Sequence, residues 1–160
     1  MSAVSSVQVG VAGPAVWVRV EGRGSFQNSA GLKEFAAEMR RRGHRDFIVD
    51  LANCELMDST FLGTLAGIAL GLGKDGRLTV VRPNARNRDV MSNLGLDRIF
   101  TVSDQVPEPL PTKLESAEPG APQPAQRETI VEAHENLVAA SPENAVRFKD
   151  VLDFLKHKEP

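Results

Sequence analysis

The chain has 160 residues, a formal net charge of -2, 41% apolar residues and 25% charged residues. This length predicts one domain with an appendage, and the apolar share is enough to build a core. The small net charge gives no electrostatic reason to expect binding to nucleic acid or to an anionic membrane. One cysteine, Cys54, excludes an intramolecular disulfide, and the first ten residues lack the regions of a secretion signal, so we expect a cytoplasmic protein.

The first part of the chain predicts a β-hairpin followed by an amphipathic helix. Valines alternate with small or polar residues over 7–11 and again over 16–20, and a Gly-Pro turn lies between them. The next loop ends at Asn28 or the following serine, either of which is a good helix cap. The helix then shows apolar residues with helical spacing and ends at Gly43.

Strands and helices then alternate. Short apolar strands are expected at 47–51, 78–81 and 99–102, and helices at 59–73 and 85–94 between them. The element order is therefore β-β-α-β-α-β-α-β. Helices that cross between strands imply an α/β fold in which the later strands are parallel.

The longest apolar run, residues 61–73, carries Gly63, Gly67 and Gly71 on one helical face. Small residues on one face also occur where membrane helices pair. A membrane-spanning helix, however, needs about 20 residues, and this run is shorter. We therefore interpret it as a helix packed closely on a sheet, and expect no membrane association.

A Pro-rich segment separates the α/β region from the C-terminal part of the chain. Large apolar residues are almost absent over 106–126, which predicts an extended, partly stiff linker that cannot order itself. Beyond it we expect one helix over 129–139 and a second that starts at Ser141-Pro142, with proline at the first helical position. The predicted stripes are Ile130/His134/Leu137 and Phe148/Val151/Leu152/Leu155.

The predicted domains are therefore an α/β domain over 1–105, the linker over 106–126 and a helical hairpin over 127–160. A hairpin of this size has too small a core to stand alone. We expect it to dock on its own domain, on a second copy or on another protein. Between the two intermolecular arrangements, self-association is favoured over a foreign partner, so a homo-oligomer formed through the hairpin is one of the arrangements considered.

No group of residues predicts an enzyme. Ser59 lacks the flanking glycines of a nucleophile elbow, and His44 would lie roughly 20 Å away along the expected strand. His134 and His157 are interpreted as ordinary residues of the hairpin. Asp50 ends a strand, but the preceding strands supply no acidic residues to complete a phospho-aspartate receiver site. No His, Cys and Asp cluster has metal-ligand spacing, so we expect no metal and no cofactor.

The most informative stretch leads from the strand at 47–51 to Asp58-Ser59, at the start of the long apolar helix. Serine is a preferred N-cap, because its oxygen accepts a bond from an amide of the first turn. Helix N-termini also favour anions, so a phosphate would be tolerated there. Ser59 therefore offers a hydroxyl that phosphorylation can convert into a strongly anionic group.

Residues 47–63 resemble the STAS domain of bacterial anti-sigma factor antagonists. In that family a strand ending in an Asp-hydrophobic pair leads into Asp-Ser-(Ser/Thr)-Gly-Leu-Gly, and the serine after the aspartate is phosphorylated. The matching residues here are Asp58, Ser59, Thr60, Leu62 and Gly63, and Phe61 replaces the first glycine. Gly22 and the turn at 93–96 also match, so the resemblance covers about residues 6–105.

The resemblance implies the STAS fold, a mixed and mostly parallel sheet with helices on one side, here followed by the C-terminal hairpin. It also implies a non-enzymatic switch that regulates transcription. The unphosphorylated protein would sequester a serine-kinase anti-sigma factor, which in turn phosphorylates Ser59, and a PP2C-type phosphatase would reverse the reaction. The partner surface would include Ser25, Asn28, Asp58, Ser59, Thr60 and Phe61, with Asp58 orienting the hydroxyl or the partner.

Two alternatives stay open. The protein could be a structural subunit of a stressosome-like scaffold, or a STAS accessory subunit of a lipid transporter. The transporter subunit needs no phosphorylation, and the pair of hydroxyls on Ser59 and Thr60 favours the switch over it.

Overall fold

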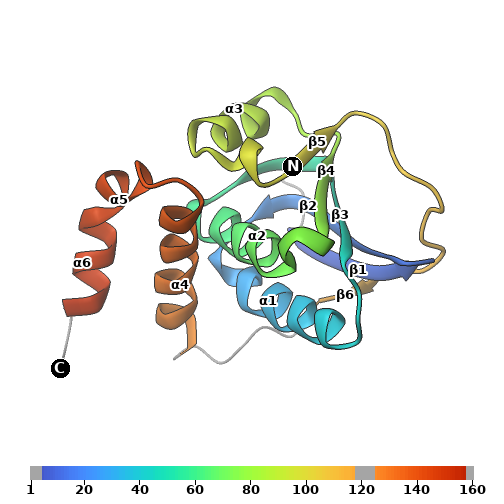
Figure 1. Cartoon of the computed structure of the whole chain (residues 1–160), viewed down its shortest axis with the longest axis horizontal. Coiled ribbons are helices and arrows are strands. Elements are labelled where there is room, and N and C mark those ends of the chain that lie inside the picture. Colours follow the sequence, from blue (N-terminus) through green and yellow to red (C-terminus); the bar gives the residue numbers. More distant parts are fainter. Residues whose placement is uncertain (1–4, 118–124, 158–160) are drawn as a thin grey trace.

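The computed structural model describes residues 5–117 and 125–157, and within them a six-stranded sheet is ordered β5-β4-β3-β2-β1-β6 (Figure 1). The strands are β1 (Ser6–Ala12), β2 (Ala15–Gly24), β3 (Asp46–Met57), β4 (Arg77–Val81), β5 (Thr101–Ser103) and β6 (Glu115–Ser116). Strands β2 to β5 pair in parallel, and β1 is antiparallel to both of its neighbours. The predicted mixed, mostly parallel sheet is confirmed.

The helices of the α/β region cover one face of this sheet, as predicted. They are α1 (Phe26–Arg41), α2 (Ser59–Leu72) and α3 (Ala85–Asn93), with 3-10 turns η1 (Gly73–Asp75) and η2 (Leu96–Arg98). Alternate residues of the β1–β2 hairpin, such as Val16, Val18 and Val20, lie in the main core with Leu32 of α1 and Leu65 of α2. The two-residue period of a strand thus places one valine face of the hairpin against the helices.

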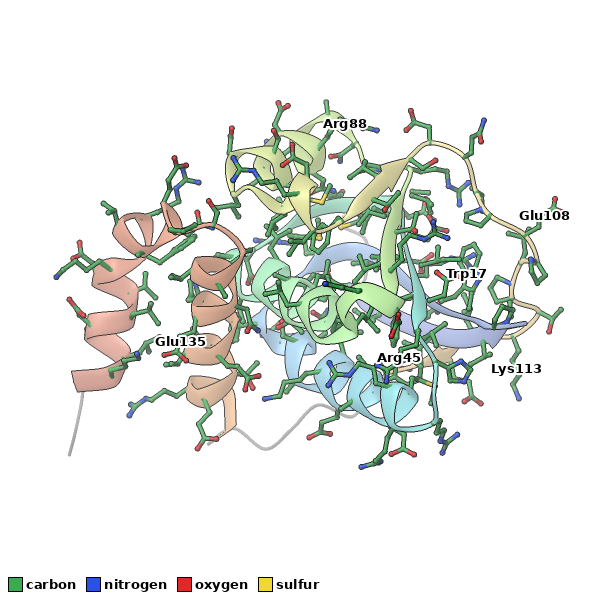
Figure 2. The ribbon with its side chains drawn as sticks, in the orientation of Figure 1. Trp17, Arg45, Arg88, Glu108, Lys113 and Glu135 are labelled. Atoms are coloured by element: carbon green, nitrogen blue, oxygen red, sulfur yellow. The ribbon has the colours of Figure 1, made fainter. Side chains whose placement is uncertain are left out.

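The opposite face of the sheet is covered by the segment that follows β5. A smaller apolar cluster there consists of Ala12, Ala15, Trp17, Ile48 and Val81, with Val106 and Leu114 packed against it. Figure 2 shows Trp17 on the side of the sheet where the chain carrying Glu108 and Lys113 passes. The prediction that 106–126 cannot order itself is wrong for 106–117, because its few apolar residues pack on the sheet and β6 pairs with β1. Residues 118–124 lie outside the described residues.

Several predicted boundaries in the α/β region are wrong. Strand β2 continues to Gly24, whereas the prediction ended it at residue 20, and the last strand is 101–103 instead of 99–102 because η2 precedes it. Helix α1 begins at Phe26 with Ser25 as its N-cap, and Asn28 lies in the first turn, where its Oδ1 accepts a bond from Ser25 N at 3.0 Å. Strand β3 continues to Met57, whereas the prediction ended it at residue 51. It continues because it keeps pairing with β2 as far as Gly24, through two register shifts.

The C-terminal helices dock on the α/β region. Helix α4 (Ala125–Ala140) lies beside α1 and α2, and α5 (Asn144–Arg147) leads to α6 (Lys149–His157) on the outer side of α4 (Figure 1). Docking on its own domain was one of the three expected arrangements. Association between copies stays a prediction. None of the described helices is both long and apolar enough to cross a membrane.

The prediction of a single second helix starting at Ser141-Pro142 is wrong, because the structure divides this segment into α5 and α6. Asn144 holds the start of α5 against α4 and the end of α3. Its side chain is 1% exposed, and its Nδ2 donates to Leu94 O at 3.0 Å and to Leu137 O at 2.8 Å. These bonds tie the start of α5 to α4 and to the end of α3.

Candidate functional site

Two strands end side by side at one edge of the sheet, and each leads directly into a helix. Parallel pairing places Gly24 of β2 beside Met57 of β3, and Asp58 N donates to Gly24 O at 2.9 Å. The N-termini of α1 and α2 therefore meet at this edge. The carboxyl ends of parallel strands are where α/β folds most often bind ligands.

The Asp58 carboxylate accepts a backbone hydrogen bond from the first turn of each helix. Its Oδ1 accepts a bond from Phe61 N at 2.8 Å in α2, and its Oδ2 accepts one from Phe26 N at 2.9 Å in α1. One carboxylate thus satisfies amides of two helix termini, and its negative charge complements both helix dipoles.

The prediction that Ser59 is the N-cap of α2 is wrong. Asp58 is the N-cap, and Ser59 is the first residue of the helix. A carboxylate is a stronger acceptor for amides than a hydroxyl, which explains why the aspartate takes this position. The Ser59 hydroxyl is consequently available to a different partner.

That partner is His134 of α4, which lies 75 residues away in sequence. The distance between Ser59 Oγ and His134 Nε2 is 2.8 Å, and His134 Nδ1 lies 2.7 Å from the carbonyl oxygen of Ile130. A carbonyl oxygen only accepts, so Nδ1 carries a proton. In the neutral ring, Nε2 then accepts the bond from the Ser59 hydroxyl.

The interpretation of His134 as an ordinary residue of the hairpin is wrong, because the residue is buried. It is 3% exposed, and its ring packs edge-on against Phe148 at a centroid distance of 4.9 Å. A signal for this was present in the sequence. His134 lies on the apolar stripe between Ile130 and Leu137, and a polar residue on a buried stripe needs a hydrogen-bond partner.

The Ser59–His134 pair holds the hydroxyl in place but lacks the third member of a hydrolase triad. In a triad, a carboxylate stabilises the imidazolium that forms when histidine takes the serine proton. Here Nδ1 bonds the neutral Ile130 carbonyl instead. Within residues 5–117 and 125–157, no three His, Cys, Asp or Glu side chains are placed to hold a metal ion.

Three residues of the predicted partner surface are buried, namely Asn28, Thr60 and Phe61. Thr60 is 5% exposed and Phe61 is 0% exposed. The Phe61 ring lies so close to Gly24 that a Cβ on this glycine would overlap it. In this conformation Thr60 and Phe61 cannot contact a partner, and the phenylalanine that replaces the motif glycine extends the core instead.

The surface beside Ser59 is formed by the start of α1. Asn28 is 7% exposed, whereas Phe26 is 39% exposed although its backbone bonds Asp58. Aromatic residues are enriched in protein interfaces, so Phe26 is a candidate contact that the sequence analysis missed. Its only sequence signal was an aromatic residue in the loop before the expected helix.

Cys54 lies in β3, close in sequence to this edge. Its side chain is 3% exposed, and burial raises the pKa of the thiol above its ordinary value of 9.0. A thiol in this state is a packing residue and a poor nucleophile.

The comparison with family models decides the family. The model described as "Mlab, STAS domain" matches residues 7–103, which is more than half of the chain. The chain belongs to the STAS domain family. Its β1–β5 sheet, with α1 to α3, lies within the match, and α4 to α6 follow it.

Solved structures show the same fold. An anti-sigma factor antagonist from Mycobacterium paratuberculosis is 22% identical, with a TM-score of 0.59 over 66% of this chain and 92% of its own. The anti-sigma factor antagonist SpoIIAA in its unphosphorylated form is 18% identical, with a TM-score of 0.57 over 62% of this chain and 90% of its own. SpoIIAA from Bacillus in its phosphorylated form is 19% identical, with a TM-score of 0.53 over 62% of this chain and 93% of its own. The comparison with curated proteins found no match.

Proposed function

We propose that this STAS protein is an anti-sigma factor antagonist. It binds a serine-kinase anti-sigma factor in the cytoplasm and so regulates transcription, and phosphorylation of Ser59 ends the binding. The observation that supports this most is the placement of Asp58-Ser59 at the start of α2, at an edge shared with α1 and beside the exposed ring of Phe26. A PP2C-type phosphatase would return the protein to its binding state.

The physical basis of the switch is charge. Phosphoserine adds about -1.5 to -2 charges. At the first residue of α2 these charges face a helix N-terminus, so the fold tolerates them. Inside a partner interface and next to the Asp58 carboxylate they would be repelled and hard to desolvate. Complete reversal of binding needs about 5.5 kcal/mol of differential affinity, a size that an interfacial phosphate beside a carboxylate can reach.

A decisive experiment uses a serine-kinase anti-sigma factor from the same organism with Mg²⁺ and ATP, followed by mapping of the phosphate by mass spectrometry. We expect phosphate on Ser59 and none on Thr60, which is 5% exposed. Ser59→Ala should bind the kinase and remain unphosphorylated. Ser92→Ala, at an exposed serine of α3, serves as the matched control and should behave as wild type. Phosphate elsewhere with Ser59 untouched would refute the assignment.

Affinity separates the switch from the two alternatives. Ser59→Asp should weaken kinase binding, whereas a transporter subunit would be indifferent to this change. A scaffold subunit would instead form large assemblies in solution, which analytical ultracentrifugation of the wild-type protein detects.

A further inference from the structure

Helix α4 covers the surface on which the proposed switch depends. Ala133 is 1% exposed and Leu137 is 0% exposed, both turned toward the α/β region. The backbones of α2 and α4 touch, because a Cβ on Gly63 would overlap the Ala133 carbonyl. Together with His134 on Ser59, these contacts place one face of α4 over the first turns of α2.

The rest of this contact is polar and incompletely packed. Asn136 Nδ2 donates to Gly63 O at 3.2 Å, and Lys33 Nζ lies 2.8 Å from Glu132 Oε1. The side chains of Lys33 and Glu132 are 44% and 52% exposed, and exposed ion pairs add little stability. A cavity of about 290 Å³ remains between α1, α2 and α4. Opening this contact withdraws Leu137 from the main core but breaks no strand pairing of the sheet, so α4 can open locally.

Docked α4 covers one side of the Ser59 hydroxyl, although the Ser59 residue stays partly exposed. The Ser59 hydroxyl faces a histidine that is 3% exposed, and the neighbouring Ala133 is 1% exposed. Phosphoryl transfer requires the γ-phosphate of ATP to approach the hydroxyl in line with the leaving group. The kinase must therefore reach the Ser59 hydroxyl, and docked α4 occupies the side of the hydroxyl on which His134 lies.

We propose that α4 is an intramolecular cover for Ser59, which competes with the serine kinase for the α1–α2 surface and leaves that surface when Ser59 is phosphorylated. This inference rests on the proposed function. It predicts that the full chain binds the kinase more weakly than its open form does. If α4 is docked 99% of the time, the apparent affinity falls about 100-fold.

The first test needs no kinase. Hydrogen-deuterium exchange of residues 127–140 is measured in the full-length wild type, in Ser59→Glu and in the control Ser92→Glu. The carboxylate at residue 59 should speed exchange in α4 about tenfold or more, equivalent to roughly 1.4 kcal/mol of docking free energy. Equal protection of α4 in all three proteins would overturn the cover.

The second test locks α4 in place. A Cβ on Gly67 would lie 3.0 Å from Asn136 Cγ. This matches the distance of about 3 Å from a Cβ to the far sulfur of a disulfide. The pair Gly67→Cys and Asn136→Cys should therefore form a disulfide between α2 and α4. In the oxidised double-cysteine protein, Ser59 should be phosphorylated about tenfold more slowly than in the same protein after reduction.

The third test loosens α4. His134→Ala removes the bond to Ser59 and the contact with Phe148, and should speed phosphorylation of Ser59 roughly five- to tenfold. His44→Ala, at a half-buried histidine outside α4, is the control and should leave the rate unchanged. A thermal melt establishes whether each variant is folded. If His134→Ala is unfolded, the oxidised and reduced forms of the double-cysteine protein test the cover instead.

The outcomes separate the two proposals. Equal rates of Ser59 phosphorylation in the oxidised double-cysteine protein, its reduced form and His134→Ala would refute the cover while leaving the phospho-switch intact. No phosphate on Ser59 in any of them, with α4 exchange still accelerated by Ser59→Glu, would refute the kinase switch and support α4 as a charge-sensitive cover of this surface.

Discussion

Asp58 provides a direct test of how the site is built. Asp58→Ala removes the acceptors for Phe61 N and Phe26 N, which lie 2.8 Å and 2.9 Å from its carboxylate. Loss of an N-cap costs about 1 kcal/mol. The second bond, from Phe26 N, lies at an exposed position, so it adds only about 1 kcal/mol, the net value of a typical hydrogen bond. We therefore expect the free energy of unfolding to fall by about 2 kcal/mol.

Asp58→Asn separates the two bonds. The asparagine oxygen can still accept from Phe61 N, but its NH₂ group cannot accept from Phe26 N. This variant should lose about 1 kcal/mol, and its melting temperature should fall by about 2–4 °C, half the change expected for Asp58→Ala.

Urea unfolding followed by the fluorescence of Trp17, the one tryptophan of the chain, measures these differences, since this residue is 1% exposed. Asp89→Asn, at an exposed acid of α3, is the control and should stay within about 0.5 kcal/mol of wild type. If Asp58→Ala also stayed within that margin, the two hydrogen bonds to Asp58 would contribute nothing to stability. Asp58 would then act only on the hydroxyl or the partner, as its sequence position alone suggests.

The remaining predictions concern two buried side chains. Phe61→Ala should cost about 3–5 kcal/mol by opening a cavity against Gly24, whereas Phe26→Ala, at a ring 39% exposed, should cost far less in the same urea assay. Because burial raises the pKa of the Cys54 thiol, a thiol reagent at pH 8 should label the native protein slowly and the urea-unfolded protein quickly. The same shift means that Cys54 favours the folded state below its ordinary pKa of 9.0, and that this contribution is lost as the pH rises above it. Fast native labelling at pH 8 would contradict the burial of Cys54.

The alternating valines at 7–11 and 16–20 determined the first hairpin from the sequence alone, because a strand repeats every two residues whatever lies around it. The order of strands and helices likewise implied the parallel sheet, and Asp58-Ser59 indicated a helix start with a modifiable hydroxyl. These features depend on neighbours in the chain. Local residues therefore suffice to predict them.

Tertiary structure decided which side chain does what at that helix start. The pairing of β2 with β3 brings Phe26 N to Asp58, so the aspartate becomes the cap and the Ser59 hydroxyl is left for another partner. That partner, His134, lies 75 residues further along the chain. Burial of Phe61 against Gly24 and the packing of 106–117 on the sheet have the same origin. Contacts between distant segments leave only a weak trace in the local pattern, because the free energy that selects them comes from burial and hydrogen bonding across the assembled fold.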